Sequence, residues 1–365
     1  MTDIVIRRYK DGDENQIVEL IKQEFNLRIN PKIDLIIWKW KYKENPAPTR
    51  AVILVAEDKN RNKIIGHYAI NPMIMKWKDK EIIGSQVSGI VTHKNYRRRG
   101  IFKALAINSS DDAGKEGIPV TYVFPNLNSY NLFKKIGWSH IFSLTKMLKV
   151  LNIKTLSRKY NNNAIKRKII EASLRTYYTY ISFKSPSFRG TRPPENITIF
   201  EVKRFDRSFD DLWTHISKYY EYIVKRDAKY LNWRYSHPYP YENFKIFASK
   251  KNNNIAGYVI LKCKILPDVK IGYIFDLFCN PNDKSMIRSL ISKSIEYFVR
   301  RKMDIIHFCV LKEHPYYRIC KEFGFLKKEE IPLVLHINTY GFENAEEFKD
   351  PRKWLLSYGD REGSF

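Results

Sequence analysis

The chain has 365 residues, which is too long for one ordinary domain. Hydrophobic residues make up 44% of it and aromatic residues 14%, enough for two packed cores. Its 65 Lys and Arg against 39 Asp and Glu give a net charge of +26, which favours acidic partners such as nucleotides, nucleic acids or anionic lipid surfaces. A biased genome composition explains the charge equally well, because Lys, Ile, Asn and Tyr are all abundant.

The cysteines and the hydropathy restrict the class of protein further. The four cysteines (Cys263, Cys279, Cys309 and Cys320) form no Cys-x-x-Cys pair, so we expect buried free thiols in a reducing compartment and no metal site. The chain opens without a charged-then-apolar leader, and no apolar run approaches the ~18 residues that span a bilayer. These features predict a soluble, cytoplasmic protein.

The first half of the chain predicts strands that alternate with helices. Period-2 alternation and Gly/Asn punctuation support the strands. The expected strands are 3–9, 51–57, 63–77, 81–92, 118–124 and 138–149, and the expected helices are 14–25, 100–115 and 128–136.

The segment QVSGIVTHKNYRRRGIFKAL, at positions 86–105, is the most informative part of the sequence. An apolar stretch ends at Val91, a polar turn carries Arg97–Arg99, and a helix begins after Gly100. Backbone N–H groups at a helix start favour an anion, and glycine lets the backbone approach it closely. This order predicts a phosphate-binding turn. A basic surface turn that binds nothing is the alternative.

A second segment, IPVTYVFPNLNSYNLFKKIGW, follows at positions 118–138 with a strand, a Pro-Asn break, a short helix and Gly-aromatic. Together the two segments resemble the GNAT N-acetyltransferase family, whose acyl-CoA signature is an Arg or Gln followed three residues later by Gly. The resemblance covers residues 1–149 and implies a GNAT fold with acetyl-CoA as acyl donor. The chain departs from the family at Phe102, where a second small residue is usual.

The resemblance also implies roles for individual residues. Backbone groups of the strand would line the pantetheine, and amides of the turn would take the pyrophosphate. Many family members place a Tyr as the acid for the thiolate where this chain has Phe133, so Tyr130 is the candidate acid, and Glu81 is the candidate base. The expected cofactor-binding residues are Gly89, Ile90, Val91, Arg97, Arg98, Arg99, Gly100, Ile101, Phe102 and Asn126.

The second half repeats the first in outline. IIGHYAI (64–70) resembles IAGYVIL (255–261), and LFKKIGW (132–138) resembles ICKEFGF (319–325), which indicates a tandem duplication. We expect strands at 197–203, 244–249, 255–264, 270–279 and 304–310, helices at 206–224, 284–302 and 314–323, and an aromatic segment at 230–235. The second loop has Asp283 and no glycine before its helix, so we expect this copy not to bind CoA.

A basic segment joins the two halves. Residues 149–194 contain eleven Lys or Arg and one acid, Glu171, and 164–182 carries an apolar stripe with helical spacing. A linker helix packed on one domain is the favoured interpretation, and a membrane-surface or nucleic-acid contact through 154–192 is the alternative. The Pro, Gly and Ser of 185–196 predict a hinge.

The C-terminal segment KWLLSYGDREG, at 353–363, is apolar enough to pack. Related tandem acetyltransferases found with sugar and surface-polysaccharide enzymes are similar here and at WRYSHP (233–238), which points to an amino-sugar or nucleotide-sugar acceptor. Asp360 would then contact the substrate, and a structural turn Asp is the equal alternative.

The expected fold class is therefore α/β (α+β), with two GNAT-like domains that each hold a mixed, mostly antiparallel sheet flanked by helices. The expected function is transfer of an acetyl group from acetyl-CoA to a primary amine of a small, acidic acceptor. A non-catalytic acyl-CoA-binding relative and a Fem-like tRNA-dependent aminoacyl transferase are the alternatives. The expected parts are a GNAT domain at 1–149, a connector at 150–196, a degenerate GNAT-like domain at 197–340 and a tail at 341–365.

Overall fold

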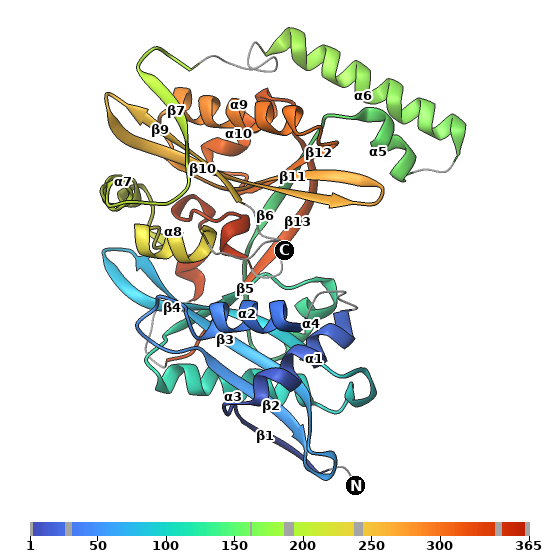
Figure 1. The fold of residues 1–365 in the computed structure, drawn as a ribbon, viewed down its shortest axis with the longest axis vertical. Coiled ribbons are helices and arrows are strands. Elements are labelled where there is room, and N and C mark those ends of the chain that lie inside the picture. The colour runs from blue at the N-terminus through green and yellow to red at the C-terminus, as the bar shows by residue number, and fades with distance from the viewer. Residues whose placement is uncertain are drawn as a thin grey trace. The chain divides into compact units, whose positions relative to one another are not determined.

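The computed structural model describes residues 3–25, 31–160, 163–185, 193–236, 244–339 and 345–361. The chain forms two compact units (Figure 1). Unit 1 consists of Met1–Phe142 and Pro332–Lys349, and unit 2 consists of Ser143–Ile331 and Asp350–Phe365.

Unit 1 is built on a mixed sheet in the order β1-β2-β3-β4-β5-β13. Neighbouring strands are antiparallel except for the parallel pair β4/β5. The strands are β1 (Ile4–Arg8), β2 (Val52–Asp58), β3 (Lys63–Trp77), β4 (Lys80–Thr92), β5 (Val120–Val123) and the last part of β13 (Leu326–Ile337).

Successive strand residues point to opposite sides of this sheet, so both faces carry apolar side chains. Helices cover both faces. On one face, α1 (Asp13–Phe25) and α2 (Pro31–Tyr42) bury Ile17 and Trp38 against Val55. On the other face, α3 (Ile101–Lys115) and α4 (Leu127–Lys135) bury Leu105 and Phe133 in the cluster that contains Leu54. The short 3₁₀ helices η1 (Lys59–Arg61) and η2 (Lys94–Tyr96) complete the loops.

Unit 2 has a sheet of the same design, in the order β6-β12-β11-β10-β9-β7, with β11/β12 as its parallel pair. Its strands are β6 (Ser139–Val150), β7 (Ile197–Val202), β9 (Phe244–Lys251), β10 (Asn254–Leu266), β11 (Val269–Cys279) and β12 (Ile305–Val310), and a short β8 covers Tyr222–Val224. Its helices are α5 (Ile153–Tyr160), α6 (Ala164–Lys184), α7 (Ser208–Ile216), α8 (Ala228–Tyr235), α9 (Lys284–Arg300) and α10 (Pro315–Glu322), with 3₁₀ turns η4 (Ser217–Tyr219), η6 (Pro351–Lys353) and η7 (Tyr358–Asp360).

The two units share one topology, and each completes its sheet with a strand from the other half of the chain. Strand β13 follows α10 in sequence but pairs with β5 in unit 1, whereas β6 follows α4 but pairs with β12 in unit 2. Nothing in the sequence pattern indicated this exchange. The repeated sequence motifs occupy equivalent places, since IIGHYAI lies in β3 and IAGYVIL in β10. The expected fold of two mixed, mostly antiparallel sheets with flanking helices is confirmed.

Some predicted elements differ from the structure. The single helix expected at 206–224 is wrong, because α7 ends at Ile216 and the chain continues through η4 into β8. There Tyr222 forms a parallel bridge to the buried Trp354, a contact that overrides the local helical pattern. Helix α2 was not predicted, and the aromatic segment at 230–235 lies in α8.

Other expectations concern the thiols and the hinge. All four cysteines are free; three are buried and Cys263 is half-buried, which confirms the expectation of unpaired thiols. Most of the hinge expected at 185–196 lies outside the described residues. Within the parts of the chain that the structure describes, no helix is both long and apolar enough to cross a membrane.

Candidate functional site

In unit 1, strand β4 diverges from β5 and contains a β-bulge. The two strands pair only from Gly84–Val120 to Gln86–Tyr122, and β4 then continues to Thr92. On its other side β4 has a bulge, because His67 pairs with Val91 while Ala69 pairs with Ser88. The extra residue turns the strand, as bulges near active sites often do. The backbone of Gly89–Val91 is therefore bent beside the diverging strand.

Gly89 allows this bend and leaves no room for a larger residue. Its φ of +60° is unfavourable for a side chain, and an added Cβ would lie 2.7 Å from Tyr42 Oη and 2.8 Å from His67 Cε1. Tyr42 Oη also lies 3.0 Å from Ser88 Oγ. Side chains from α2 and β3 thus hold the bulge from within the core.

His67 fixes the bulge through its ring. Its Nδ1 lies 2.6 Å from the carbonyl oxygen of Gly89, and the side chain is fully buried. Burial lowers the pKa of His67 to about 4, since the charged ring would be desolvated. At neutral pH the ring is therefore uncharged, and its Nδ1–H donates to Gly89. His67 was not among the residues predicted from the sequence, although it is the one side chain in the apolar run IIGHYAI whose usual pKa lies near neutrality.

The turn after β4 leads to a helix start that is open to solvent. Arg98 and Gly100 both have left-handed backbone, with φ of +63° and +76°. Among the described residues no side chain caps α3, and an added Cβ at Gly100 would meet nothing within 4 Å. The first N–H groups of a helix have no acceptor within it, and the helix dipole gives them positive potential. The arrangement suits an anion.

The arginines of the turn have different surroundings. Arg97 pairs with Glu24 of α1, and its Nε donates to the carbonyl oxygen of Thr92 at 3.2 Å. The guanidinium of Arg99 lies over the ring of Tyr96, 5.2 Å from its centre. Arg97 therefore ties the turn to α1 and β4.

The side chains of three further predicted cofactor residues have structural roles. Phe102 points into the core, where its ring centre lies 5.3 Å from that of Phe133, so the bulky residue leaves the turn open. Asn126 caps α4, because its Oδ1 accepts from the backbone N–H of Ser129 at 2.9 Å. Ile101 is buried under α3.

The two candidate catalytic residues lie in different places. Tyr130, on α4, is half-buried, with its ring centre 5.8 Å from that of His140. Glu81 is exposed at the start of β4, in register with Lys76. Glu81 and Gly89 are eight positions apart along the strand, a distance of roughly 26 Å at the usual rise. The structure does not bring Glu81 to the bulge.

Unit 2 also has a bulged strand that diverges from its parallel neighbour, but its helix start is capped. Strand β11 carries a bulge at Phe275, and it pairs with β12 only from Ile271–Ile305 to Ile274–Phe308. The helix that follows is capped by its own sequence, because Asp283 accepts from the backbone N–H of Met286 at 3.0 Å. The same carboxylate pairs with Lys251 at 2.6 Å. An acidic group thus stands where an anion would have to bind.

The C-terminal tail lies along the diverging strands of unit 2. The ring of Tyr358 lies 5.4 Å from Tyr273 and stacks on Phe275 of β11 at 6.1 Å. Arg361 Nη1 lies 3.9 Å from Cys309 Sγ on β12. All of 354–360 is buried. The tail therefore contacts both strands at the place where unit 1 has its bent, diverging strand.

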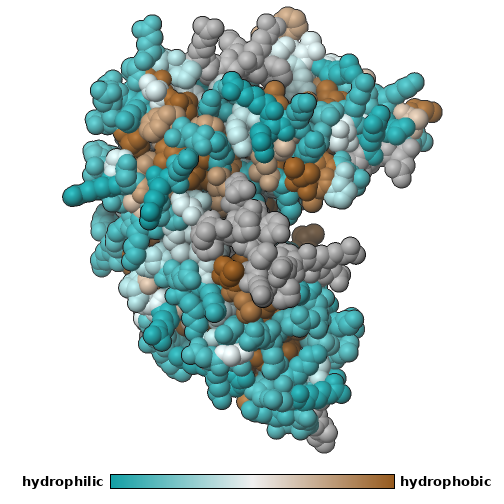
Figure 2. Space-filling model, viewed as in Figure 1, coloured by the Kyte–Doolittle hydropathy of each residue, from teal (hydrophilic) through white to brown (hydrophobic). Residues whose placement is uncertain are grey.

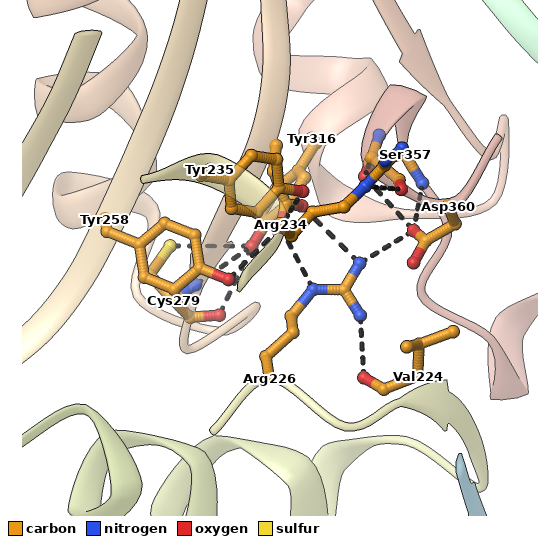
Figure 3. Close-up of polar contacts among 11 residues, drawn as sticks. Val224, Arg226, Arg234, Tyr235, Tyr258, Cys279, Tyr316, Ser357 and Asp360 are labelled. Atoms are coloured by element: carbon orange, nitrogen blue, oxygen red, sulfur yellow. Dashed lines mark hydrogen bonds and ion pairs between the residues drawn. The ribbon is translucent and has the colours of Figure 1, made fainter. Parts of the chain in front are cut away.

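A buried charge cluster anchors this tail (Figure 3). Arg226 donates to Asp360 at 2.7 Å and to Asp276 at 3.1 Å, and all three side chains are buried. Tyr258 Oη donates to Asp276 as well, at 3.1 Å. Burial raises the pKa of Asp360, while Arg226 opposes that shift. Asp360 also accepts from the N–H of Ser357. The structure thus places Asp360, a candidate substrate contact, inside a turn and an ion pair.

Comparisons with known proteins agree with this geometry. Residues 5–141 match the model of the acetyltransferase (GNAT) domain. A GCN5-related N-acetyltransferase from Anabaena variabilis is similar in structure, with a TM-score of 0.65 and 14% identity over 92% of this chain and 73% of that one. No curated protein matches the sequence.

Two further solved structures are similar in fold. The N-myristoyltransferase of Saccharomyces cerevisiae, solved with bound myristoyl-CoA, has a TM-score of 0.61 and 11% identity over 93% of this chain and 83% of its own. A tandem GNAT protein from the clavulanic acid biosynthesis pathway has a TM-score of 0.55 and 12% identity over 92% of this chain and 99% of its own. Residues 5–141 therefore match the GNAT domain family, and the chain as a whole has a fold similar to that of a tandem GNAT protein.

Proposed function

We propose that the chain is an N-acyltransferase that moves an acetyl group from acetyl-CoA to the primary amine of a small, acidic acceptor. The observation that carries this proposal is the uncapped start of α3, which follows a turn with Arg98 and Gly100 in left-handed conformation. Such a helix start is a site for a phosphate group. It directly follows the bulged end of β4, so one extended ligand could contact both.

The residues present fit an acyl-CoA. The amides from Arg97 to Phe102 would take the pyrophosphate, and the bent backbone of Gly89–Val91 would line the pantetheine. Phe102 does not obstruct the turn, because its ring is in the core. The bound myristoyl-CoA of the yeast enzyme supports acyl-CoA as the class of donor, and acetyl is the length that we propose here.

The bound thioester would supply the electrophilic carbonyl, and the chain would position it and manage protons. Tyr130 is the candidate donor of a proton to the departing thiolate. We assign no dedicated base: Glu81 lies at the far end of β4 from the bulge, and an acceptor amine that binds in a site without water would have a lowered pKa and could attack as the free base. His67 acts as a positioning residue, since it is fully buried and bonded to Gly89.

We propose a single acyl-CoA site for each chain. In unit 2, Asp283 caps the helix start and pairs with Lys251, which leaves an anion no favourable place. The tail residue Tyr358 packs on the bulged strand. Asp360 holds the tail and does not enter the proposed acceptor site. The acceptor class that we favour is an amino sugar or a nucleotide sugar. The phosphates of a nucleotide sugar would suit a chain with net charge +26.

The test is an acetyl-transfer assay that follows release of the CoA thiol over a panel of amino sugars, nucleotide amino sugars and simple amines. Tyr130→Phe should lower kcat and leave KM for acetyl-CoA unchanged, with the exposed Tyr219→Phe as the matched control. An unchanged kcat would remove Tyr130 from the mechanism. Binding of acetyl-CoA without transfer to any amine would favour a non-catalytic relative. Absence of binding would overturn the proposal.

A further inference from the structure

Helix α6 of unit 2 rests on its unit by one side only (Figure 1). On that side, Leu174 and Tyr178 pack against the cluster around Val150, and Tyr178 Oη accepts from the N–H of Val150 at 2.8 Å. None of the side chains of α6 is fully buried. The opposite side of the helix has no part in this packing.

The opposite side carries large apolar groups. Four of them lie in water, with exposed fractions that are high for such residues: Ile165 71%, Ile169 59%, Tyr180 56% and Phe183 81%. At 3.6 residues per turn these positions, with Ala172 and Thr176 between them, fall within a sector of about 80°. We call this set of six residues the apolar stripe. In Figure 2 the surface at the α6 end of unit 2 shows hydrophobic patches among hydrophilic groups.

Basic residues border the stripe on both sides. Lys168 and Arg175 fall on one edge of the stripe and Lys166 and Lys184 on the other, all exposed. The acid of the segment faces away, because Glu171 accepts from Ser157 Oγ at 2.6 Å beneath the helix. The outward surface of α6 is therefore apolar along its middle and cationic along both edges.

This arrangement fits a lipid surface better than a nucleic acid. Phosphates of RNA would meet the cations but leave the apolar stripe in water. At a bilayer, the stripe enters the headgroup region while the long basic side chains reach the lipid phosphates. With 21 residues, the helix could lie flat over about 31 Å of membrane surface.

We propose that α6 docks unit 2 on an anionic lipid bilayer, with the apolar stripe inserted and the four bordering cations on lipid phosphates. This proposal is independent of the acyltransferase activity. It explains why apolar residues recur at helical spacing on the side of α6 that the protein does not cover.

The test is co-sedimentation of the full chain with vesicles of phosphatidylcholine containing phosphatidylglycerol, and with vesicles of phosphatidylcholine alone. The wild type should bind the anionic vesicles and bind less in high salt. Ile169→Glu with Phe183→Glu should lower the apparent affinity by at least tenfold. Replacing the four bordering cations with Gln should lower it about fivefold for each residue near the surface.

The matched control places the same change elsewhere on unit 2. Ile265→Glu with Val299→Glu alters two residues that are 70% and 55% exposed, and it should bind vesicles like the wild type. Circular dichroism establishes that each variant is folded. Failure of the wild type to bind anionic vesicles, or equal binding by the stripe variant, would overturn the proposal. So would a stripe variant that loses only RNA binding, measured by anisotropy, or only self-association, measured by sedimentation velocity.

Discussion

Replacement of Gly100 by Asp should remove most of the affinity for acetyl-CoA while the protein stays folded. Gly100 is the open residue at the start of α3, where a Cβ meets nothing within 4 Å. A carboxylate there would lie about 5 Å from a phosphate on the first turn, and at an effective dielectric between 20 and 80 the repulsion is about 1–3 kcal/mol. That range weakens binding about 5- to 150-fold.

Thermal unfolding with and without acetyl-CoA measures the effect, and titration calorimetry gives Kd. At 100 times its Kd, the ligand should stabilise the wild type by about 2.7 kcal/mol. With a Kd about 50-fold higher, the same concentration should stabilise the variant by only about 0.65 kcal/mol. A side chain at this left-handed position should cost the free protein about 1–2 kcal/mol, and the carboxylate should offset about 0.3–1 kcal/mol of that because it lies at a helix N-terminus.

Two controls separate charge from backbone effects. Gly100→Asn has the same shape without the charge, and Asn tolerates left-handed backbone. Gly117→Asp places the charge at the other end of α3, in a turn with φ of +75° and equally open space. Equal affinity of the Asp and Asn variants at Gly100 would refute the anion site at α3. Full stoichiometric binding by Gly100→Asp with unchanged affinity would refute a single site in unit 1.

Three further predictions concern stability, each measured by urea unfolding. Gly89→Ala should lower the free energy of unfolding by about 2–5 kcal/mol, from the left-handed backbone and from overpacking against Tyr42 and His67. Adding Tyr42→Phe should recover part of this loss. A neutral effect of Gly89→Ala would contradict the bulge geometry. Because the pKa of His67 is about 4 in the folded chain and ~6.5 unfolded, the unfolded state binds the proton first, and stability should fall by up to about 3 kcal/mol as the pH drops from 6.5 to 4. His67→Asn should flatten that decline, and an unchanged pH profile would show that His67 does not cause it. Arg226→Met should cost about 3–5 kcal/mol because two buried carboxylates lose their counter-charge. Changing both carboxylates to Asn in the same chain should recover most of the loss, and no recovery would exclude that cause.

The two units combine one backbone design with different helix starts. Both units have a bulge on the strand that leads to their central helix. In unit 1 the bulge is followed by an uncapped helix start, and in unit 2 by a helix that Asp283 caps. The difference rests on a few residues, because a carboxylate satisfies the same backbone donors that would hold a phosphate.

The sequence by itself determined the local elements and the class of fold. The turn before Gly100, the repeated IIGHYAI pattern and most strands follow from local periodicity and from residues with special backbone preferences. Such signals depend on neighbours a few positions apart, so they can be recognised without the rest of the chain. The placement of the turn before Gly100 at the start of a helix needed nothing more.

Only the tertiary structure decided which distant segments meet. The exchange of β6 and β13, the contact of Gly89 with Tyr42 and His67, and the burial of Asp360 on Arg226 join residues far apart in the chain. Local pattern carries no record of such partners, because any strand of suitable alternation could complete either sheet. For the same reason the sequence did not show that Glu81 lies at the opposite end of β4 from the bulge.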